Sequence, residues 1–165
     1  MKIGRITASD RVSAGVYEDR SGPEIERTLR AVFGDQVQFE AAVVPDDAPQ
    51  LAEVLRDFAD RRGCQLIVTT GGTGIGPRDV TPEATRAVLE KELPGFGELM
   101  RLHSFAKIKT AILSRATAGV RGRSLIVNLP GKPAAVAQCL AILTEAIREG
   151  LEHLQGRDPH SPPHS

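Results

Sequence analysis

The chain has 165 residues, of which 41% are hydrophobic and 25% are charged, and its 21 basic and 21 acidic side chains cancel. This composition is typical of a soluble globular protein with a core of its own. Zero net charge argues against a nucleic-acid binder that depends on phosphate contacts. The sequence contains no apolar run of the roughly 20 residues that a membrane span needs and no apolar signal segment, so we expect no membrane attachment.

Cysteine usage indicates a reducing compartment. Cys64 precedes an apolar strand pattern, and Cys139 lies within an apolar helix pattern. Buried free thiols are therefore expected rather than a disulfide or a metal-binding pair. With no signal segment in view, we expect a cytoplasmic protein.

Hydrophobic periodicity predicts a chain in which strands and helices alternate. Strands are expected at residues 2–8, 37–44, 66–70, 109–115 and 124–129, and helices at 22–33, 48–62, 82–92, 96–105 and 133–154. The expected helix N-caps are Ser21, Thr81 and either Asp46 or Asp47, because their side-chain oxygens can accept bonds from the first free N–H groups. Residues 116–122 are expected to turn, and residues 12–19 to form a loop long enough to reach over a site.

The order of these elements predicts the fold class α/β. Strands that alternate with helices form an open, mostly parallel sheet with helices on both faces, which is a three-layer α/β/α sandwich. Residues 1–155 are expected to form a single domain. The polar, proline-rich end at residues 156–165 is expected to be disordered.

A glycine-rich loop directly follows the most apolar strand. The run LIVTT at residues 66–70 shows no alternation, which is typical of a strand buried on both faces. Four glycines between residues 71 and 76 leave the backbone free to approach an oxyanion. Thr70 and Thr73 add hydroxyl donors, and Arg78 adds a counter-charge. The loop could cradle a phosphate, but a short glycine pattern is about as often a tight loop only.

Polar residues gather at the ends of four predicted strands. They are Ser9-Asp10, Pro45-Asp46, the segment 70–79 and the segment 128–132. Ligands of open α/β sheets bind outside the carboxyl ends of the strands, so together these groups predict a site although each aspartate alone could be a cap or a turn residue. Asp46 and Asp79 are the expected ligands of Mg²⁺, which prefers carboxylate and phosphate oxygens.

Several separated motifs resemble one known family. They are TGGTG at 70–74, RDVTPEAT at 78–85, PGFGE at 94–98, AILSR at 111–115 and NLPG at 128–131, with SDR at 9–11, SAG at 13–15 and PD at 45–46. In this order they resemble the MogA/MoaB family of molybdenum-cofactor biosynthesis, and the resemblance runs from about residue 3 to residue 154. Several motifs in one order are far more specific than the glycine loop alone.

The resemblance implies a molybdopterin adenylyltransferase that uses ATP, molybdopterin and Mg²⁺. It further implies a homotrimer and a partner in the molybdate-inserting enzyme of the same pathway. Asp46 and Asp79 would be catalytic, and the substrates and their phosphates would contact Ser9, Asp10, Thr70, Gly71, Gly72, Thr73, Gly74, Arg78, Ser114, Arg115, Asn128, Pro130 and Gly131. The alternatives are a non-catalytic molybdopterin carrier or scaffold with the same pocket, and another phosphate enzyme such as a nucleotide hydrolase.

Overall fold

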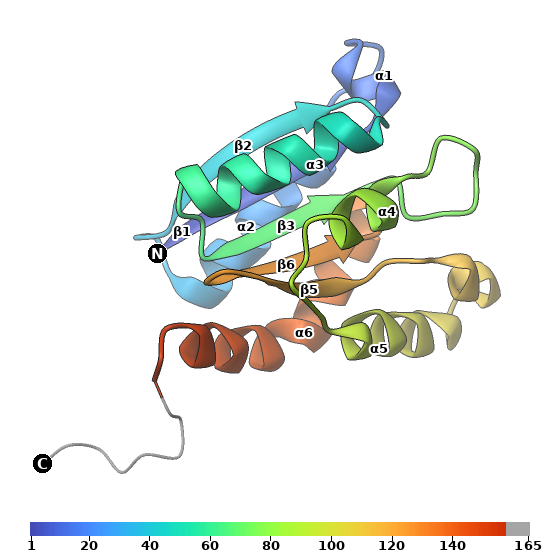
Figure 1. Cartoon of the computed structure of the whole chain (residues 1–165). Coiled ribbons are helices and arrows are strands. Elements are labelled where there is room, and N and C mark those ends of the chain that lie inside the picture. The colour runs from blue at the N-terminus through green and yellow to red at the C-terminus, as the bar shows by residue number, and fades with distance from the viewer. Residues whose placement is uncertain (158–165) are drawn as a thin grey trace, which may run out of the picture.

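The computed structural model describes residues 1–157 and contains one six-stranded sheet between two layers of helices (Figure 1). The strands are β1 (Lys2–Ala8), β2 (Gln38–Val44), β3 (Leu66–Thr70), β4 (Lys91–Glu92), β5 (Ala118–Arg121) and β6 (Ser124–Leu129). Their order in the sheet is β2-β1-β3-β6-β5-β4. Strands β2, β1, β3 and β6 are parallel to one another, whereas β5 is antiparallel to its neighbours β6 and β4. The predicted mostly parallel α/β sandwich is confirmed.

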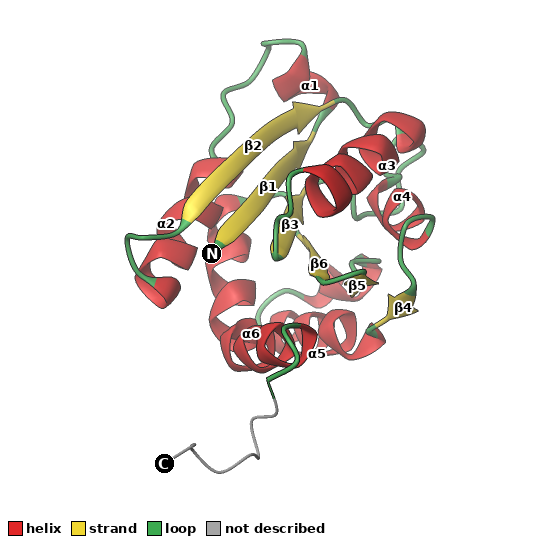
Figure 2. Ribbon diagram, turned by 60° about the vertical axis from the view of Figure 1, so that its left-hand side comes forward, coloured by secondary structure: helices red, strands yellow, loops and turns green. Residues whose placement is uncertain are grey.

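The helices divide between the two faces of the sheet (Figure 2). One face is covered by α2 (Ser21–Phe33), α5 (Pro94–Phe105) and α6 (Pro133–Leu154), and the other by α3 (Ala48–Arg56), η1 (Asp57–Arg61) and α4 (Thr81–Arg86). The short helices α1 (Asp10–Ser13) and η2 (Lys109–Leu113) lie in connections. No helix within residues 1–157 is long and apolar enough to cross a membrane.

Strand β3 supplies side chains to both cores. Leu66 and Val68 pack into the core under α2 and α6, while Ile67 packs into the core under α3. Successive side chains of a strand point to opposite faces, so a strand covered on both sides has no solvent-facing position for an unpaired polar residue. All five residues of β3 are buried: the first three are apolar, and the hydroxyl groups of Thr69 and Thr70 form hydrogen bonds within the protein.

The connections place a crevice beside β1. The chain leaves β1 through α2 to reach β2 on one side, and it returns through α3 to β3 on the other side. The loops that follow β1 and β3 therefore diverge to opposite faces, and ligands of such sheets bind at this point. Thr7 near the end of β1 pairs with Thr70 at the end of β3, so the two loops start side by side.

Three predicted elements are wrong. Residues 109–115 form no strand, since the 3₁₀ helix η2 occupies Lys109–Leu113, and the expected turn at 116–122 contains β5. The helix predicted at 82–92 ends at Arg86, because Lys91–Glu92 pairs with β5 as the edge strand β4. A surface segment with exposed apolar side chains, here Ile112 and Leu113, carries the same pattern as a half-buried strand.

Two predicted helix caps have another role. Ser21 and Thr81 lie inside their helices, which begin after Arg20 and Val80, and neither of these preceding residues makes a side-chain cap. The Ser21 hydroxyl donates to the Gly131 carbonyl, and the Thr81 hydroxyl donates to the Gly71 carbonyl. Asp47 does cap α3, since its Oδ1 accepts from the Gln50 amide at 2.9 Å. Disorder was expected at residues 156–165, and residues 158–165 of this segment lie outside the described residues.

Asn128 joins three elements inside the fold. It is fully buried on β6, its Nδ2 donates to Thr69 Oγ1 at 3.0 Å and to Thr85 Oγ1 at 2.9 Å, and its Oδ1 accepts from the Thr117 amide at 3.3 Å. These partners lie on β3, on α4 and just before β5. The amide therefore ties the sheet to α4, and the predicted substrate residue Asn128 binds protein groups in this structure.

Replacing Asn128 by Leu should lower the free energy of unfolding by about 2–4 kcal/mol, because buried hydroxyl and amide partners lose their bonds. Urea denaturation of the variant and of the parent measures this difference. Gln36→Leu on the exposed loop before β2 is the control and should change stability by about 0.5 kcal/mol or less. A stable Asn128→Leu protein that loses only substrate affinity would contradict this structural role.

Candidate active site

Two cavities flank the glycine loop at the carboxyl ends of the strands. The first has a volume of about 580 Å³ and lies among the ends of β1 and β3, the loop after α1 and the start of α2. The second has a volume of about 530 Å³ and lies among the glycine loop, α5, η2 and the start of α6. Asp79 and Gly131 line both of them. Cavities of this size accommodate small organic ligands.

The glycines are required where the loop leaves β3. Gly71 has φ +91° and Gly72 has φ +66°, a region that side chains disfavour. A Cβ atom on Gly71 would overlap the Ala8 carbonyl, and one on Gly72 would overlap Thr81 Oγ1 and lie 3.1 Å from Asp46 Oδ1. The loop backbone is therefore packed against the end of β1 and the start of α4, and its peptide groups form the wall of the first cavity.

Arg115 holds the outer part of the loop. Its Nε donates to the Gly74 carbonyl at 2.7 Å, its Nη2 donates to the Asp79 carbonyl at 2.8 Å, and it also pairs with Glu83. Its own amide donates to the Thr73 carbonyl at 2.8 Å. The guanidinium lines neither cavity. Arg115, a predicted substrate residue, therefore holds the loop in shape in this structure.

Asp10 and Asp46 bind each other's backbone. The Asp10 amide donates to Asp46 Oδ2 at 3.0 Å, and the Asp46 amide donates to Asp10 Oδ1 at 3.0 Å. Arg78 completes the arrangement with two bonds to the Asp10 carboxylate, at 3.0 and 3.1 Å. The hydrogen bond from Arg78 and the one from the Asp46 backbone lower the pKa of Asp10. Asp10 and Arg78, both predicted substrate residues, line neither cavity. In this structure Asp10 binds Asp46, and Arg78 binds Asp10.

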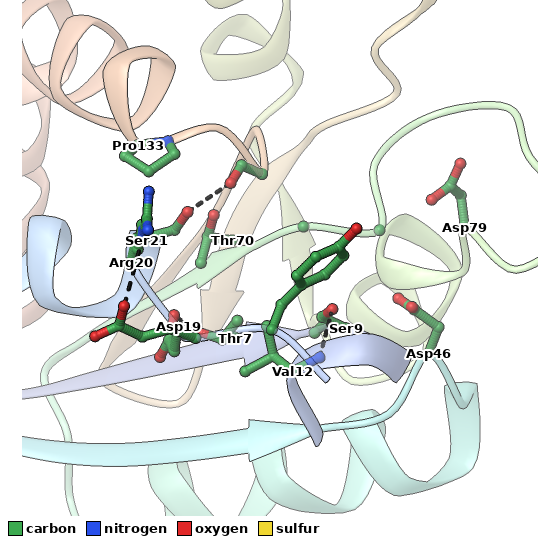
Figure 3. Close-up of a pocket in the computed structure, with 16 residues that line it drawn as sticks. Thr7, Ser9, Val12, Asp19, Arg20, Ser21, Asp46, Thr70, Asp79 and Pro133 are labelled. Carbon is green, nitrogen blue, oxygen red and sulfur yellow. Dashed lines mark hydrogen bonds and ion pairs between the residues drawn. The ribbon is translucent and has the colours of Figure 1, made fainter. Parts of the chain in front are cut away.

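The protein compensates the charge of Asp46 only in part, through the Asp10 amide and the nearby Arg78. Its Oδ1 is buried without a hydrogen-bond partner within residues 1–157. Burial raises the pKa of Asp46, and the nearby charges of Asp10 and Asp79 raise it further. Figure 3 shows Asp46 and Asp79 together at one end of the first cavity, with Asp19 and Ser21 at the other. A cation between the two carboxylates would relieve this repulsion.

The donor set suits a magnesium ion that phosphate oxygens help to bind. No group of three or more histidine, cysteine or acidic side chains within the described chain could hold a metal by itself. Magnesium in nucleotide enzymes is commonly held by one or two carboxylates together with substrate phosphates and water. Asp46 and Asp79 fit this pattern, although Asp79 Oδ2 also accepts from the Gly76 amide at 2.8 Å.

The charges of the two cavities differ. The first is lined by four acidic side chains and one arginine, namely Glu18, Asp19, Asp46, Asp79 and Arg20. The second is lined by one acidic and three basic side chains, namely Asp79, Arg101, Lys107 and Lys132. An anionic ligand can therefore bind directly in the second cavity, whereas a polyphosphate in the first needs a cation as well.

Comparisons with known proteins agree with this geometry. The sequence matches the family described as "Probable molybdopterin binding domain" over residues 4–149. It is 49% identical to the molybdopterin adenylyltransferase of Helicobacter pylori strain J99, and the match covers 88% of this chain and 82% of the relative. It is 41% identical to the molybdopterin adenylyltransferase of Escherichia coli K12, and that match covers 88% of this chain and 75% of the relative. The crystal structure of the molybdopterin biosynthesis enzyme MoaB from Thermus thermophilus superposes with a TM-score of 0.85, at 43% identity, and covers 94% of this chain and 97% of that one.

The chain belongs to the MogA/MoaB family. Within the fold of this family, the structure brings eleven of the predicted site residues to the cavities. Ser9, Asp46, Thr70, Gly71 and Gly72 line the first, Thr73, Gly74, Ser114 and Pro130 line the second, and Asp79 and Gly131 line both. Asp10, Arg78, Arg115 and Asn128 lie beside them and bind protein groups instead.

Sequence reasoning missed residues from two segments. Tyr17, Asp19 and Ser21 in the first cavity belong to the loop and helix after α1, and Arg101 and Lys107 in the second belong to α5 and its end. The loop at 12–19 was expected to reach over a site, which was the available signal for the first group. The second group had none, because α5 was identified as a helix without a reason to place it near the glycine loop.

We expect Asp46→Asn to raise the thermal stability of the free protein at neutral pH. The raised pKa of Asp46 means that its ionised form destabilises the folded state, and the amide removes that charge while it keeps a carbonyl for the Asp10 amide. As the pH falls through the raised pKa, the parent binds a proton in the folded state and regains this stability. The gain in Tm should therefore shrink between neutral and acidic pH.

Thermal denaturation of both proteins across this pH range, without nucleotide or metal, measures the effect. Asp35→Asn on the exposed loop before β2 provides a control for the loss of one negative charge. A variant less stable than the parent at every pH would contradict the inference that the ionised form of Asp46 destabilises the folded protein.

Proposed function

We propose that this protein is a molybdopterin adenylyltransferase of molybdenum-cofactor biosynthesis. A terminal phosphate oxygen of molybdopterin attacks the α-phosphorus of ATP, the bond from that phosphorus to the bridging β-phosphate oxygen breaks, and pyrophosphate leaves. The products are adenylylated molybdopterin and pyrophosphate. The H. pylori and E. coli relatives carry this activity in their names.

The observation that carries the proposal is the pair of cavities that meet at one carboxylate and one glycine loop. Adenylyl transfer needs two substrates whose phosphates approach each other, with their organic parts directed apart. Asp79 and Gly131 line both cavities, so phosphates bound on either side of the loop converge at these residues. A nucleotide hydrolase needs one organic ligand and a water molecule, and it has no use for the second cavity.

The residues of the chain would act by position and charge. A phosphate nucleophile is already anionic at neutral pH, so the reaction requires alignment and charge neutralisation more than a general base. Asp46 and Asp79 would hold Mg²⁺, which neutralises charge on the leaving pyrophosphate when it is bound. Thr70 to Gly74 would hold the phosphates, and the contact between Asp10 and Asp46 would keep the carboxylate in place.

The charge on Asp46 favours an enzyme over a carrier. The carboxylate oxygen Oδ1 of Asp46 is buried without a hydrogen-bond partner in the described chain, which destabilises the free protein, and a protein that only binds molybdopterin would gain nothing from it. An adenylyltransferase uses the same charge to bind the cation that accompanies ATP. The non-catalytic carrier remains the alternative outcome of the experiment below.

The test is adenylyl transfer by the parent and by Asp79→Asn. Purified protein is incubated with molybdopterin, ATP and Mg²⁺, and adenylylated molybdopterin and pyrophosphate are quantified. The parent should form both in equal amounts, and EDTA should stop the reaction. Asp79→Asn should lose about 100-fold or more in kcat, or about 3 kcal/mol of transition-state stabilisation, with little change in molybdopterin affinity.

Asp35→Asn serves again as the matched control and should retain full turnover, because Asp35 lies on an exposed loop outside both cavities. A parent that binds molybdopterin but forms no product would favour the carrier. Unchanged turnover by Asp79→Asn would remove Asp79 from the catalytic residues.

We further propose that the chain forms a homotrimer in the cytoplasm and passes its product to the molybdate-inserting enzyme. Apolar side chains on α5, on η2 and directly before η2 support self-association, because Leu102, Ile112 and Ile108 are 73%, 60% and 57% exposed. The two elements lie in contact with each other, so these side chains belong to one region of the surface.

Size-exclusion chromatography with light scattering should therefore give about three times the chain mass of 17.7 kDa. Leu102→Glu should shift the mass towards that of a monomer, because a charge would be buried at the contact. Val43→Glu, which changes a 40% exposed side chain on the edge strand β2, is the control and should leave the mass unchanged. A monomeric parent would contradict the proposed assembly.

A further inference from the structure

Tyr17 is an aromatic residue exposed at the first cavity. It lines that cavity, and its exposed fraction is 57%. The five phenylalanines of the chain are all buried or half-buried. Burial of an aromatic side chain stabilises a fold, so an aromatic ring left in solvent at the wall of a cavity contributes little to folding.

The backbone holds Tyr17 in place on a tight loop. The amides of Val16 and Tyr17 both donate to the Arg11 carbonyl, at 2.9 and 3.3 Å, and Gly15 turns the chain with φ +76°. The segment thereby folds back onto α1. Tyr17 is consequently presented by an ordered turn, and it belongs to the same loop as Asp19 on the cavity wall.

Arg11 fixes the orientation of the ring. Its guanidinium carbon lies 5.3 Å from the centroid of the Tyr17 ring, and its Nη1 donates to the Tyr17 hydroxyl at 3.4 Å. This cation–π contact occupies one part of the ring surface. The rest of the ring remains available to a ligand in the cavity.

We infer that Tyr17 stacks against the flat heteroaromatic ring of the substrate whose phosphates lie at the glycine loop. Gly71, Gly72 and Asp46 line the same cavity as Tyr17, so one ligand can contact the loop with its phosphates and the tyrosine with its ring. The identity of that ring rests on the proposed function, since adenine and the pterin of molybdopterin share this chemistry. Tyr17 would then determine affinity for the ring while the loop and the carboxylates bind the phosphates.

The chain offers a direct spectroscopic test, because Tyr17 is its single tyrosine and it contains no tryptophan. Intrinsic fluorescence of the full chain therefore reports on this ring alone. We would titrate it with ATP, with a soluble pterin phosphate and with inorganic triphosphate, all in the presence of Mg²⁺. Free N-acetyltyrosinamide at the same ligand concentrations corrects for absorption by the ligands.

A ring ligand that stacks on Tyr17 should quench its emission in a saturable manner, whereas triphosphate should not. Quenching by ATP would assign the ring to adenine, and quenching by the pterin phosphate would assign it to the pterin. Either result supports the inference. Absence of saturable quenching by both ring ligands, or equal quenching by triphosphate, would overturn it.

Variants test the same contact by calorimetry. Tyr17→Leu should weaken binding of the quenching ligand by about 10-fold or more and leave triphosphate binding unchanged, while Tyr17→Phe should stay within about 3-fold of the parent. Val16→Ala, at a neighbouring residue that is 69% exposed and outside the cavity wall, should match the parent. Tyr17→Leu with unchanged affinity for both ring ligands would refute the stacking contact.

These measurements separate this inference from the proposed function. Quenching and calorimetry require binding only, so they can succeed in a protein that transfers no adenylyl group. Conversely, full adenylyl transfer by Tyr17→Leu with an unchanged KM for both substrates would preserve the enzyme and overturn the role of Tyr17.

Discussion

The site depends on three hydroxyl groups that each bind a backbone carbonyl at the sheet edge. Thr70 donates to the Pro130 carbonyl at 2.6 Å, Thr81 to the Gly71 carbonyl at 2.9 Å, and Ser21 to the Gly131 carbonyl. They join β3, α4 and α2 to the loops that follow β3 and β6, which no longer form the hydrogen bonds of the sheet. These bonds are partly buried, and they pair carbonyls that have no partner in the sheet. The loops can therefore be irregular, as a phosphate cradle requires, and still be ordered.

At the same edge of the sheet, Asp46 lowers the stability of the folded protein. Asp46 is held by the Asp10 amide on one oxygen, and its other oxygen is buried without a partner in the described structure. The reciprocal backbone bonds and the Arg78 ion pair prevent the carboxylate from turning away to solvent. Packing alone would have favoured an uncharged residue there. A fixed carboxylate beside a cavity, with one oxygen left without a partner, is typical of a group that acts on a ligand.

The sheet could be predicted from the sequence, because burial of β3 on both faces requires the non-alternating run LIVTT at residues 66–70. It failed at β5 and η2, where the reason is equally physical. Ala118 and Gly119 are too small to carry a strand pattern, and Gly119 packs against Leu89 and the Lys91 backbone, a contact that no local pattern reveals. The exposed Ile112 imitated a strand because an apolar surface patch has the same composition as a buried face.

The sequence predicted which residues lie near the site, but it could not predict the direction of their side chains. Asp10, Arg78 and Arg115 carry the charges that a phosphate site needs, and they lie next to it, yet their side chains bind Asp46, Asp10 and the glycine loop. Direction depends on the turn that each loop makes, and that turn is set by contacts between segments far apart in the chain. Asp46 and Asp79 face the cavity as predicted because they follow strand ends that meet at one edge.

The unequal charge of the two cavities bears on how two anionic substrates can meet. A polyphosphate that enters the first cavity approaches Asp46 and Asp79, so it is repelled unless a divalent cation enters with it. The second cavity presents Arg101, Lys107 and Lys132 and can bind a phosphate monoester directly. The one acidic group on the second wall is Asp79, which faces both sides. Under the proposed function, a cation held at Asp79 would reduce the repulsion between the two phosphates, because this carboxylate lines both cavities.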